Sequence, residues 1–331
     1  MLHQRPVKMN EHPIATKKYI VPTPSIDELV ARVKKIVRLR IPGGIIYALP
    51  RYGKTYGIRY VIYELRAEYP DAVCISFGCE KKKSPSEDAF FFNLLAAAGH
   101  RGAAPGSVTK KRARLIERIC ELVDRSSHNW VVFFADEAQR LESLEYNWLH
   151  DVHNELERKG IRMITILVGQ PQLLNRKSSF IQGRETQIVL RFMLDEMRFD
   201  GIRSPEDIAT CLGGYDIACY PEGTDWTFTR FYYPEAVANG MSLEHQAGPL
   251  WDAFLDAHNA AGFGFDMEIP MQYFAHAVEI ALEENSKHDC ANFIFSRAMW
   301  DEAVKDCAYV AAQQALQDGM PDVDVGTDRA A

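Results

Sequence analysis

The feature that most constrains the fold is a short apolar run that leads through a loop into the triplet Gly53-Lys54-Thr55. Residues 45–49 have the length and composition of a buried strand, and residues 54–68 have the pattern of a helix. The chain is therefore predicted to form a strand, a tight loop and a helix in succession. A helix that begins directly after such a loop presents backbone N–H groups to an anion, so this segment predicts a phosphate site.

Further strands and helices alternate downstream of this segment. Strand-like apolar runs occur at residues 72–77, 130–135 and 161–168. Helical patterns lie between and after them, at residues 88–98, 109–124 and 144–159. This alternation predicts an α/β fold with a mostly parallel sheet flanked by helices. Ligands of such sheets bind at the carboxyl ends of the strands.

The loop before Thr55 carries the groups that hold a triphosphate. These are backbone N–H groups that face the phosphates, a lysine that reaches the β- and γ-phosphates, and a hydroxyl for Mg²⁺. Gly53 permits close approach of the backbone, although Ala48 stands where such loops usually have their first glycine. We expect ATP and Mg²⁺ as ligands, with the nucleotide bound by Pro50, Arg51, Tyr52, Gly53, Lys54, Thr55 and Tyr56.

Two acidic residues follow the strand predicted at 130–135. In a parallel sheet its carboxyl end lies beside the phosphate loop. Asp136 is therefore predicted to contact the nucleotide and to hold Mg²⁺ together with Thr55, and Glu137 to polarise the attacking water. Adjacent acids after a strand also serve as helix N-caps, which is the alternative for this pair taken alone. Together with Lys54, which we expect to act on the transferred phosphate, they favour an ATPase.

Three more residues are candidates for catalysis. Gln170 follows the strand at 161–168 and is predicted to contact the γ-phosphate or the water, although a turn residue fits the same position. Arg184 and Arg191 come after the next helix. A cation on the γ-phosphate, from the same chain or a neighbouring subunit, favours phosphoryl transfer. A solvated surface position is the alternative for each arginine.

The chain divides into four predicted segments: an N-terminal arm (1–24), a nucleotide-binding α/β domain (25–200), a helical lid and assembly region (201–317) and an acidic flexible tail (318–331). Helices are expected at about 243–258, 270–285 and 293–316. An aromatic-rich stretch precedes them, and we favour a core position over an interaction surface for its residues Tyr220, Trp226, Phe228, Phe231, Tyr232 and Tyr233.

The composition is that of a soluble globular protein, with 47% hydrophobic and 25% charged residues among 331. The longest apolar runs are far shorter than the roughly 20 residues that a membrane helix needs. Residues 1–13 are polar and basic, unlike a secretory signal, so a cytoplasmic location without membrane partners is expected. A net charge of −7 argues against coating nucleic acid with the whole surface but permits a local basic patch.

Two basic clusters form such a local reversal of charge. Basic side chains of this kind are predicted to neutralise DNA phosphates without reading bases. A solvated charged loop is the alternative. The predicted DNA contacts are Lys81, Lys82 and Lys83 after the strand at 72–77, and Lys110, Lys111, Arg112 and Arg114 at the start of a helix.

The order of three motifs resembles that of the AAA+ regulators of transposition, the TnsC/TniB group. The motifs are Gly53-Lys54-Thr55, Asp136-Glu137-Ala138-Gln139 and Leu167-Val168-Gly169-Gln170-Pro171-Gln172-Leu173. The loop Pro50-Arg51-Tyr52-Gly53-Lys54-Thr55, with Tyr19-Ile20-Val21-Pro22-Thr23 ahead of it, is most similar to TnsC of transposons with RNA-guided, CRISPR-associated targeting. The resemblance covers roughly residues 20–200.

The resemblance implies an AAA+ P-loop fold and an ATP-dependent homo-oligomer, as a ring or filament, on duplex DNA without base specificity. It also implies that the oligomer links a TniQ-like target-selection protein with its RNA-guided complex to the transposase subunits, and that ATP hydrolysis drives release. Two alternatives stay open. One is an AAA+ ATPase of the secretion or replication type, and the other is a nucleotide-gated DNA-binding scaffold that does not hydrolyse ATP.

Overall fold

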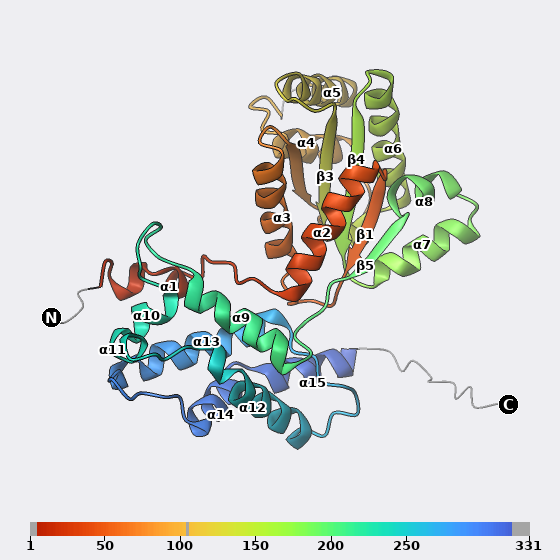
Figure 1. Cartoon of the computed structure of the whole chain (residues 1–331). Coiled ribbons are helices and arrows are strands. Elements are labelled where there is room, and N and C mark those ends of the chain that lie inside the picture. The colour runs from red at the N-terminus through yellow and green to blue at the C-terminus, as the bar shows by residue number, and fades with distance from the viewer. Residues whose placement is uncertain (1–4, 104–105, 320–331) are drawn as a thin grey trace. The chain divides into compact units, whose positions relative to one another are not determined.

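The computed structural model describes residues 5–103 and 106–319 of the chain (Figure 1). The chain divides into two compact units, one of residues 25–200 and one that combines residues 1–24 with residues 201–331. We call them the α/β unit and the helical unit. The predicted tail, 318–331, lies outside the described residues except for its first two positions. Among the described residues, no helix has the length and apolar character needed to cross a membrane.

The α/β unit contains a sheet of five strands, all parallel to their neighbours, in the order β2-β3-β4-β1-β5. The strands are β1 (Gly43–Tyr47), β2 (Val73–Gly78), β3 (Trp130–Asp136), β4 (Arg162–Gly169) and β5 (Asp195–Arg198). The helices are α2 (Pro24–Leu39), α3 (Lys54–Glu68), α4 (Glu87–Ala97), α5 (Val108–Asp124), α6 (Ser143–Arg158), α7 (Gln172–Gln182) and α8 (Thr186–Phe192), with the short 3-10 helix η2 (Ala138–Arg140).

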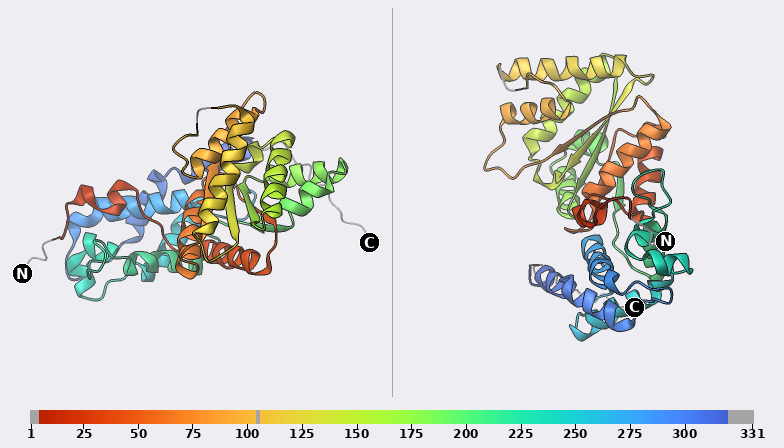
Figure 2. Two further views of the ribbon diagram at one scale, coloured as in Figure 1. Left: turned by 90° about the horizontal axis from the view of Figure 1, so that it is seen from above. Right: turned by 90° about the vertical axis from the view of Figure 1, so that its left-hand side faces the viewer.

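Helices cover both faces of this sheet. One face packs against α4, α5 and α6, whereas α2 and α3 lie on the other (Figure 2). Strand β3 shows why the strands have no polar face: Val131 and Phe133 point to one layer of helices, and Val132 and Phe134 to the other. The strand at 130–135 is therefore an uninterrupted apolar run, as its sequence indicated.

The register of the strands brings three loops to one edge of the sheet. Tyr47 at the end of β1 pairs with Gly169 at the end of β4, and Val168 pairs with Asp136 at the end of β3. The segments that follow β1, β3 and β4 therefore begin side by side. The predicted nucleotide-site residues lie on these three segments.

Strand β5 was not predicted from the sequence. It is a four-residue edge strand, Asp-Glu-Met-Arg, in which only Met197 is buried. One buried residue produces no alternating pattern, so only its pairing with β1 identifies it as a strand.

The helical unit contains helices and, among the described residues, no strand longer than an isolated bridge. Its elements are η1 (Met9–Glu11), α1 (Pro13–Thr16), α9 (Pro205–Ile217), α10 (Phe228–Tyr232), α11 (Pro234–Ala238), η3 (Glu244–Gln246), α12 (Ala247–Ala260), α13 (Met271–Asn285), η4 (Ser286–His288), α14 (Arg297–Asp306) and α15 (Tyr309–Gly319). The helix predicted over 293–316 is two helices, because the chain turns at Ala308, whose φ is 65°.

The aromatic stretch before α12 belongs to the core of this unit, which confirms the favoured interpretation. Phe228, Phe231, Tyr232 and Tyr233 are buried, and Tyr220 and Trp226 are half-buried beside them. Tyr233 Oη donates to the carbonyl oxygens of Ala281 and Leu282 at 3.2 Å, so its polar end is satisfied inside the core.

The first residues of the chain pack into the same core. The His12 ring stacks on the Phe231 ring with centroids 4.1 Å apart, and Ile14 is fully buried. Residues 1–24 were predicted as an arm because they show no sustained period. The described part of this segment is instead held by a few separate apolar and aromatic contacts, which produce no periodic pattern.

Candidate nucleotide-binding site

The phosphate-loop candidate connects β1 to α3, as predicted. Arg51 and Gly53 have positive φ values of 74° and 95°, and α3 begins at the next residue, Lys54. A φ in this range favours glycine, which explains the need for Gly53 directly before the helix. Ala48, in the place of the usual first glycine, is buried, and its N–H donates to the Gly169 carbonyl at 3.1 Å. It extends the pairing of β1 with β4.

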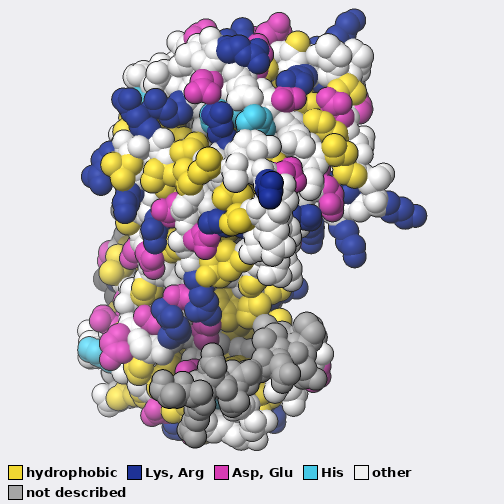
Figure 3. Space-filling view, turned by 90° about the vertical axis from the view of Figure 1, so that its right-hand side faces the viewer, with side chains coloured by type: hydrophobic (Ala, Val, Ile, Leu, Met, Phe, Trp, Pro, Cys, Tyr) yellow, Lys and Arg dark blue, Asp and Glu magenta, His cyan; other side chains and the backbone are white. Residues whose placement is uncertain are grey.

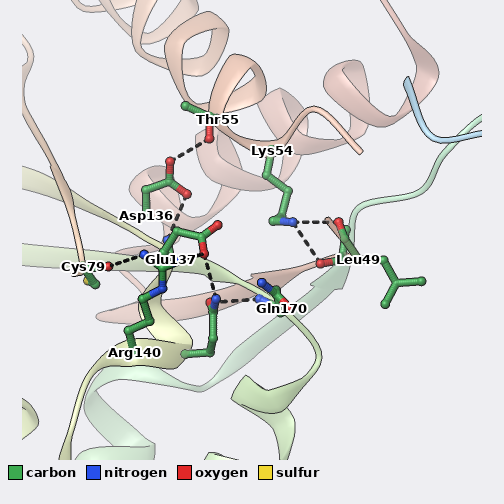
Figure 4. A network of polar contacts seen from close by, with 10 residues as sticks. Leu49, Lys54, Thr55, Cys79, Asp136, Glu137, Arg140 and Gln170 are labelled. Atoms are coloured by element: carbon green, nitrogen blue, oxygen red, sulfur yellow. Dashed lines mark hydrogen bonds and ion pairs between the residues drawn. The ribbon is translucent and has the colours of Figure 1, made fainter. Parts of the chain in front are cut away.

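Lys54 lies inside the loop. Its Nζ donates to the carbonyl oxygens of Ala48 and Leu49, each at 2.9 Å, and the side chain is buried (Figure 4). Burial lowers the pKa of the Lys54 ammonium, whereas the carboxylates of Glu137 and Asp136 oppose this shift. The ammonium is thus held at the loop by two neutral acceptors, which an anionic phosphate can replace.

Thr55, in the first turn of α3, contacts Asp136 at the end of β3. Thr55 Oγ1 donates to Asp136 Oδ2 at 2.7 Å, and the backbone N–H of Glu137 donates to Asp136 Oδ1 at 3.0 Å. A hydroxyl and a carboxylate are the oxygen ligands that Mg²⁺ accepts in proteins, usually beside water and phosphate oxygens. The two side chains therefore fit a Mg²⁺ ion.

Glu137 occupies an unusual backbone conformation directly after β3. Its φ of 57° and ψ of 36° place it in the left-handed region, which is uncommon for a residue with a side chain. The carboxylate oxygen Oε2 accepts from Gln139 Nε2 at 2.9 Å and pairs with Arg140 at 3.1 Å. Glu137 is thus held at the edge of the sheet by its own segment.

Gln170 follows β4 and lies in the same network (Figure 4). Its backbone N–H donates to Gln139 Oε1 at 3.1 Å. The structure therefore brings together Lys54, Thr55, Asp136, Glu137 and Gln170.

The side chains around the loop differ in their exposure. Pro50 is half-buried, Arg51 is exposed and Tyr52 is buried. Tyr56 is exposed, and the Arg59 guanidinium lies 5.4 Å from its ring centroid. Of these four predicted nucleotide contacts, Arg51 and Tyr56 present their side chains at the surface.

The two candidate arginines are not part of the network of Figure 4. Arg191 in α8 is held against α6: its guanidinium donates to His153 Nδ1 at 2.8 Å and to Asn154 Oδ1 at 3.2 Å, and it pairs with Glu157. Burial, and secondly Arg191, lower the pKa of His153 to about 4. Arg184 is exposed after α7 with a φ of 60°.

Several residues of the two basic clusters form ion pairs or hydrogen bonds within the α/β unit. Lys111 is buried and pairs with Asp88 at 2.7 Å, Lys82 pairs with the buried Glu145, and Arg112 pairs with Asp151 at 3.2 Å. Arg114 donates to the Gly102 carbonyl at 3.3 Å. The exposed members of the clusters are Lys81, Lys83 and Lys110.

Sequence reasoning did not assign roles to Gln139 and Arg140, although both contact Glu137. Arg140 also donates to the carbonyl of Cys79, the residue directly after β2, at 3.3 Å. The only indication in the sequence was that they follow Glu137 by two and three residues. They reach the Glu137 carboxylate because the chain turns into η2 directly after Glu137.

Comparisons with known proteins agree on the kind of fold. Residues 42–176 match a family model described as an AAA domain. A search of the curated proteins gives no match. Among solved structures, the Aeropyrum pernix ORC2 protein in its ADPNP–ADP complexes is similar with a TM-score of 0.62 and 13% identity, over 94% of this chain and 75% of that chain. The A. pernix ORC1 protein in complex with DNA is similar with a TM-score of 0.53 and 14% identity, over 93% and 72%.

At these identities the similarity concerns the fold. The five parallel strands, the flanking helices and the family match together show an AAA+ P-loop fold. The predicted fold class is confirmed.

Proposed function

Since the chain has an AAA+ P-loop fold, we propose that it binds ATP with Mg²⁺ at the carboxyl ends of β1, β3 and β4, and hydrolyses it. The observation that carries this proposal is the 2.7 Å hydrogen bond between Thr55 Oγ1 and Asp136 Oδ2. The two residues are 81 positions apart, yet their side-chain oxygens are in hydrogen-bond contact, which supports a cation bound by both. The neighbouring Lys54 supplies the charge that a triphosphate requires.

Each residue has a separate role in this proposal. Lys54 exchanges the carbonyl oxygens of Ala48 and Leu49 for phosphate oxygens. Thr55 and Asp136 hold Mg²⁺, which when bound would neutralise charge on the β- and γ-phosphates. Glu137 orients the attacking water and accepts its proton. Gln170 contacts the γ-phosphate or this water.

We propose Arg184 rather than Arg191 as the arginine that acts across a subunit interface. Arg191 is committed to His153, Asn154 and Glu157, whereas Arg184 is exposed. The face that carries α7 and α8 shows hydrophobic side chains among projecting lysines and arginines (Figure 3). Ile181 and Leu190 on these helices are 53% and 59% exposed, which supports a homo-oligomer that uses this face.

The nucleotide proposal is tested by measuring ATP binding and phosphate release with two variants. Lys54→Ala should abolish detectable binding, whereas Glu137→Gln should keep ATP affinity and lower turnover by about 10²–10⁴-fold. Full turnover in Glu137→Gln, or equal ATP affinity in Lys54→Ala, would contradict these assignments.

We further propose that the protein is a regulator of DNA transposition that oligomerises on duplex DNA. In this role it would couple a TniQ-like target-selection protein with its RNA-guided complex to the transposase, and hydrolysis would release it. The sequence motifs described above support this function. DNA binding is supported by the exposed Lys81, Lys83 and Lys110, and by one protein of this fold, A. pernix ORC1, that is in complex with DNA.

Electron microscopy on duplex DNA tests the assembly. Rings or filaments should need both ATP and DNA and should be lost in Lys54→Ala. The salt dependence of DNA binding should become shallower by about 0.9 per phosphate contact removed when Lys81, Lys83 and Lys110 are replaced by alanine. Assembly that does not depend on DNA would contradict the transposition proposal but not the ATPase proposal.

An AAA+ ATPase of the replication type is the second candidate. It is favoured by the similarity to A. pernix ORC2, which extends over 94% of this chain and therefore includes parts of both units. A gene for a transposase beside the gene for this protein, together with a change in ATPase rate when that transposase is added, would decide for transposition.

A further inference from the structure

The Gln139 amide lies between two segments of the proposed site. Gln139 Nε2 donates to Glu137 Oε2 at 2.9 Å, and the backbone N–H of Gln170 donates to Gln139 Oε1 at 3.1 Å (Figure 4). One side chain thus connects the carboxylate after β3 to the backbone after β4. Both ends of the amide are used, so its orientation is fixed by the hydrogen bonds.

The surroundings of Gln139 are shaped to receive this amide. Gly169, at the end of β4, is buried, and a Cβ at this position would lie 2.3 Å from Gln139 Oε1 and 3.2 Å from Gln139 N. Any side chain at residue 169 would therefore displace the amide. On its own segment, Ala138 is fully buried and anchors the short helix η2 that carries Gln139.

Glu137 needs such support because its backbone is in the left-handed region, with a φ of 57°. Gln139 and Arg140 both engage its oxygen Oε2. Figure 4 shows the carboxylate facing the space between Thr55 and Lys54. Holding one oxygen fixes the direction in which the other can accept a proton, which is what a general base requires.

We propose that Gln139 is a positioning residue for hydrolysis: it orients the Glu137 carboxylate and couples it to the end of β4. The inference rests on the proposed ATPase function. In that reaction the water oxygen bonds to the γ-phosphorus, the bond to the bridging oxygen of ADP breaks, and Glu137 takes the proton of the water. Because Gln170 lies at the other end of the amide, a shift of this backbone on contact with the γ-phosphate moves Glu137 as well.

Gln139→Glu tests the half of the amide that faces Glu137. The variant keeps the acceptor for the Gln170 N–H but replaces the donor to Glu137 with an oxygen of the same size. We expect kcat to fall by about 10–100-fold, with KM for ATP changed by less than about threefold. Two adjacent carboxylates bind a shared proton more readily, so part of the loss should be recovered as the pH falls from about 8 to about 6. A structural role alone would not produce this recovery.

Two other variants complete the test. Gln139→Leu removes both hydrogen bonds without adding charge, so its kcat should fall without recovery at low pH. Gln314→Glu is the matched control, because it makes the same charge change at an exposed position of α15. It should behave like the unaltered protein.

The outcomes separate this inference from the function on which it rests. If the unaltered protein hydrolyses ATP and Glu137→Gln does not, an unchanged or increased kcat in Gln139→Glu and Gln139→Leu would overturn the inference and leave the ATPase standing. Absence of hydrolysis in the unaltered protein would overturn both. A fall in ATP affinity equal to the fall in kcat would also reject it, since Gln139 would then act in binding.

Discussion

The nucleotide site of the α/β unit and the core of the helical unit use polar side chains in opposite ways. In the nucleotide site the oxygen-bearing side chains remain accessible, although Lys54 is buried: Thr55 is exposed, and Asp136 and Glu137 are only half-buried. In the helical unit Glu279 is buried and accepts hydrogen bonds from Tyr19 Oη at 2.7 Å and from Lys17 Nζ at 2.5 Å.

Both sets of side chains have partners within the protein, but Thr55, Asp136 and Glu137 remain open to a ligand, whereas Glu279 is enclosed. The carboxylate of Glu279 is occupied by residues more than 250 positions earlier in the chain. It therefore stabilises structure. Changes in the site should alter chemistry and leave stability nearly unchanged, and changes around the N-terminal segment should do the reverse.

The largest effect should follow from Phe231→Ala in the helical unit. Phe231 is fully buried and stacks on His12, so the cavity and lost contacts should cost about 3–5 kcal/mol of unfolding free energy. Denaturant unfolding would measure the loss, and ATP binding by the α/β unit is the internal control. If Phe231→Ala weakened ATP binding by as much free energy as it lost in stability, the proposed difference between the two units would be wrong.

Thr55→Val should have the converse effect. It removes the hydroxyl that donates to Asp136, and we expect a 10–100-fold weaker Mg²⁺-dependent binding of ATP, about 1.4–2.7 kcal/mol. The free energy of unfolding should change little, and Thr55→Ser should restore binding. Titration with a fluorescent ATP analogue across Mg²⁺ concentrations would show whether the hydroxyl matters.

A pH effect should follow from His12. Burial lowers its pKa to about 4, whereas an unfolded histidine titrates near 6.5. The folded state thus binds fewer protons, and stability that is present above pH 6.5 is lost as the pH falls toward 4. Between pH 7.5 and 5.5 the loss should be about 1 kcal/mol for this residue.

His12→Asn isolates that contribution. Asparagine keeps an acceptor for the Ile14 N–H, which His12 Nδ1 now caps at 3.3 Å, and does not titrate. In the variant, the unfolding free energy of the helical unit should no longer fall with pH through His12. His153 should still make the unfolding free energy of the α/β unit depend on pH. Unfolding curves at several pH values would refute the assignment if the slope of the variant were unchanged.

Ala48→Gly should have the smallest effect. It restores the glycine that the sequence pattern lacks, but Ala48 already fits its buried site and pairs with Gly169. We expect a loss of at most about 1 kcal/mol in stability from the added backbone freedom. ATP affinity, measured by calorimetry, should stay within about twofold. A tenfold gain would show that the missing glycine limits the site.

For the α/β unit, the sequence predicted the helices and strands better than it predicted the partners of the charged side chains. Helix α3 begins at Lys54 and ends at Glu68, as expected, because a strand, a loop and a helix are determined by neighbouring residues. The partners of Lys111 and Arg191 could not be predicted in this way, since Asp88 and Glu157 lie on other helices. A basic cluster in the sequence thus includes both solvated lysines and internal ion pairs.

The helical unit was harder to predict for the same reason. Its core depends on contacts between His12 and Phe231 and between Lys17 and Glu279, which no local pattern reveals. The role of Gln139 likewise depends on Gly169 in the next strand. The one distant pairing that could be predicted, between Thr55 and Asp136, follows from the general rule that the carboxyl ends of parallel strands share one edge of the sheet. Distant contacts that follow no such rule required the structure.

The division of the chain has a practical consequence for dissecting the protein. The helical unit is discontinuous in sequence, with the α/β unit inserted between residues 24 and 201. A truncation that starts at residue 25 would therefore leave the nucleotide site whole and strip the buried Ile14 and His12 from the other unit. Loss of function in such a truncated protein would report a damaged helical core. A faithful separation of the two halves would excise residues 25–200 and rejoin the flanking ends.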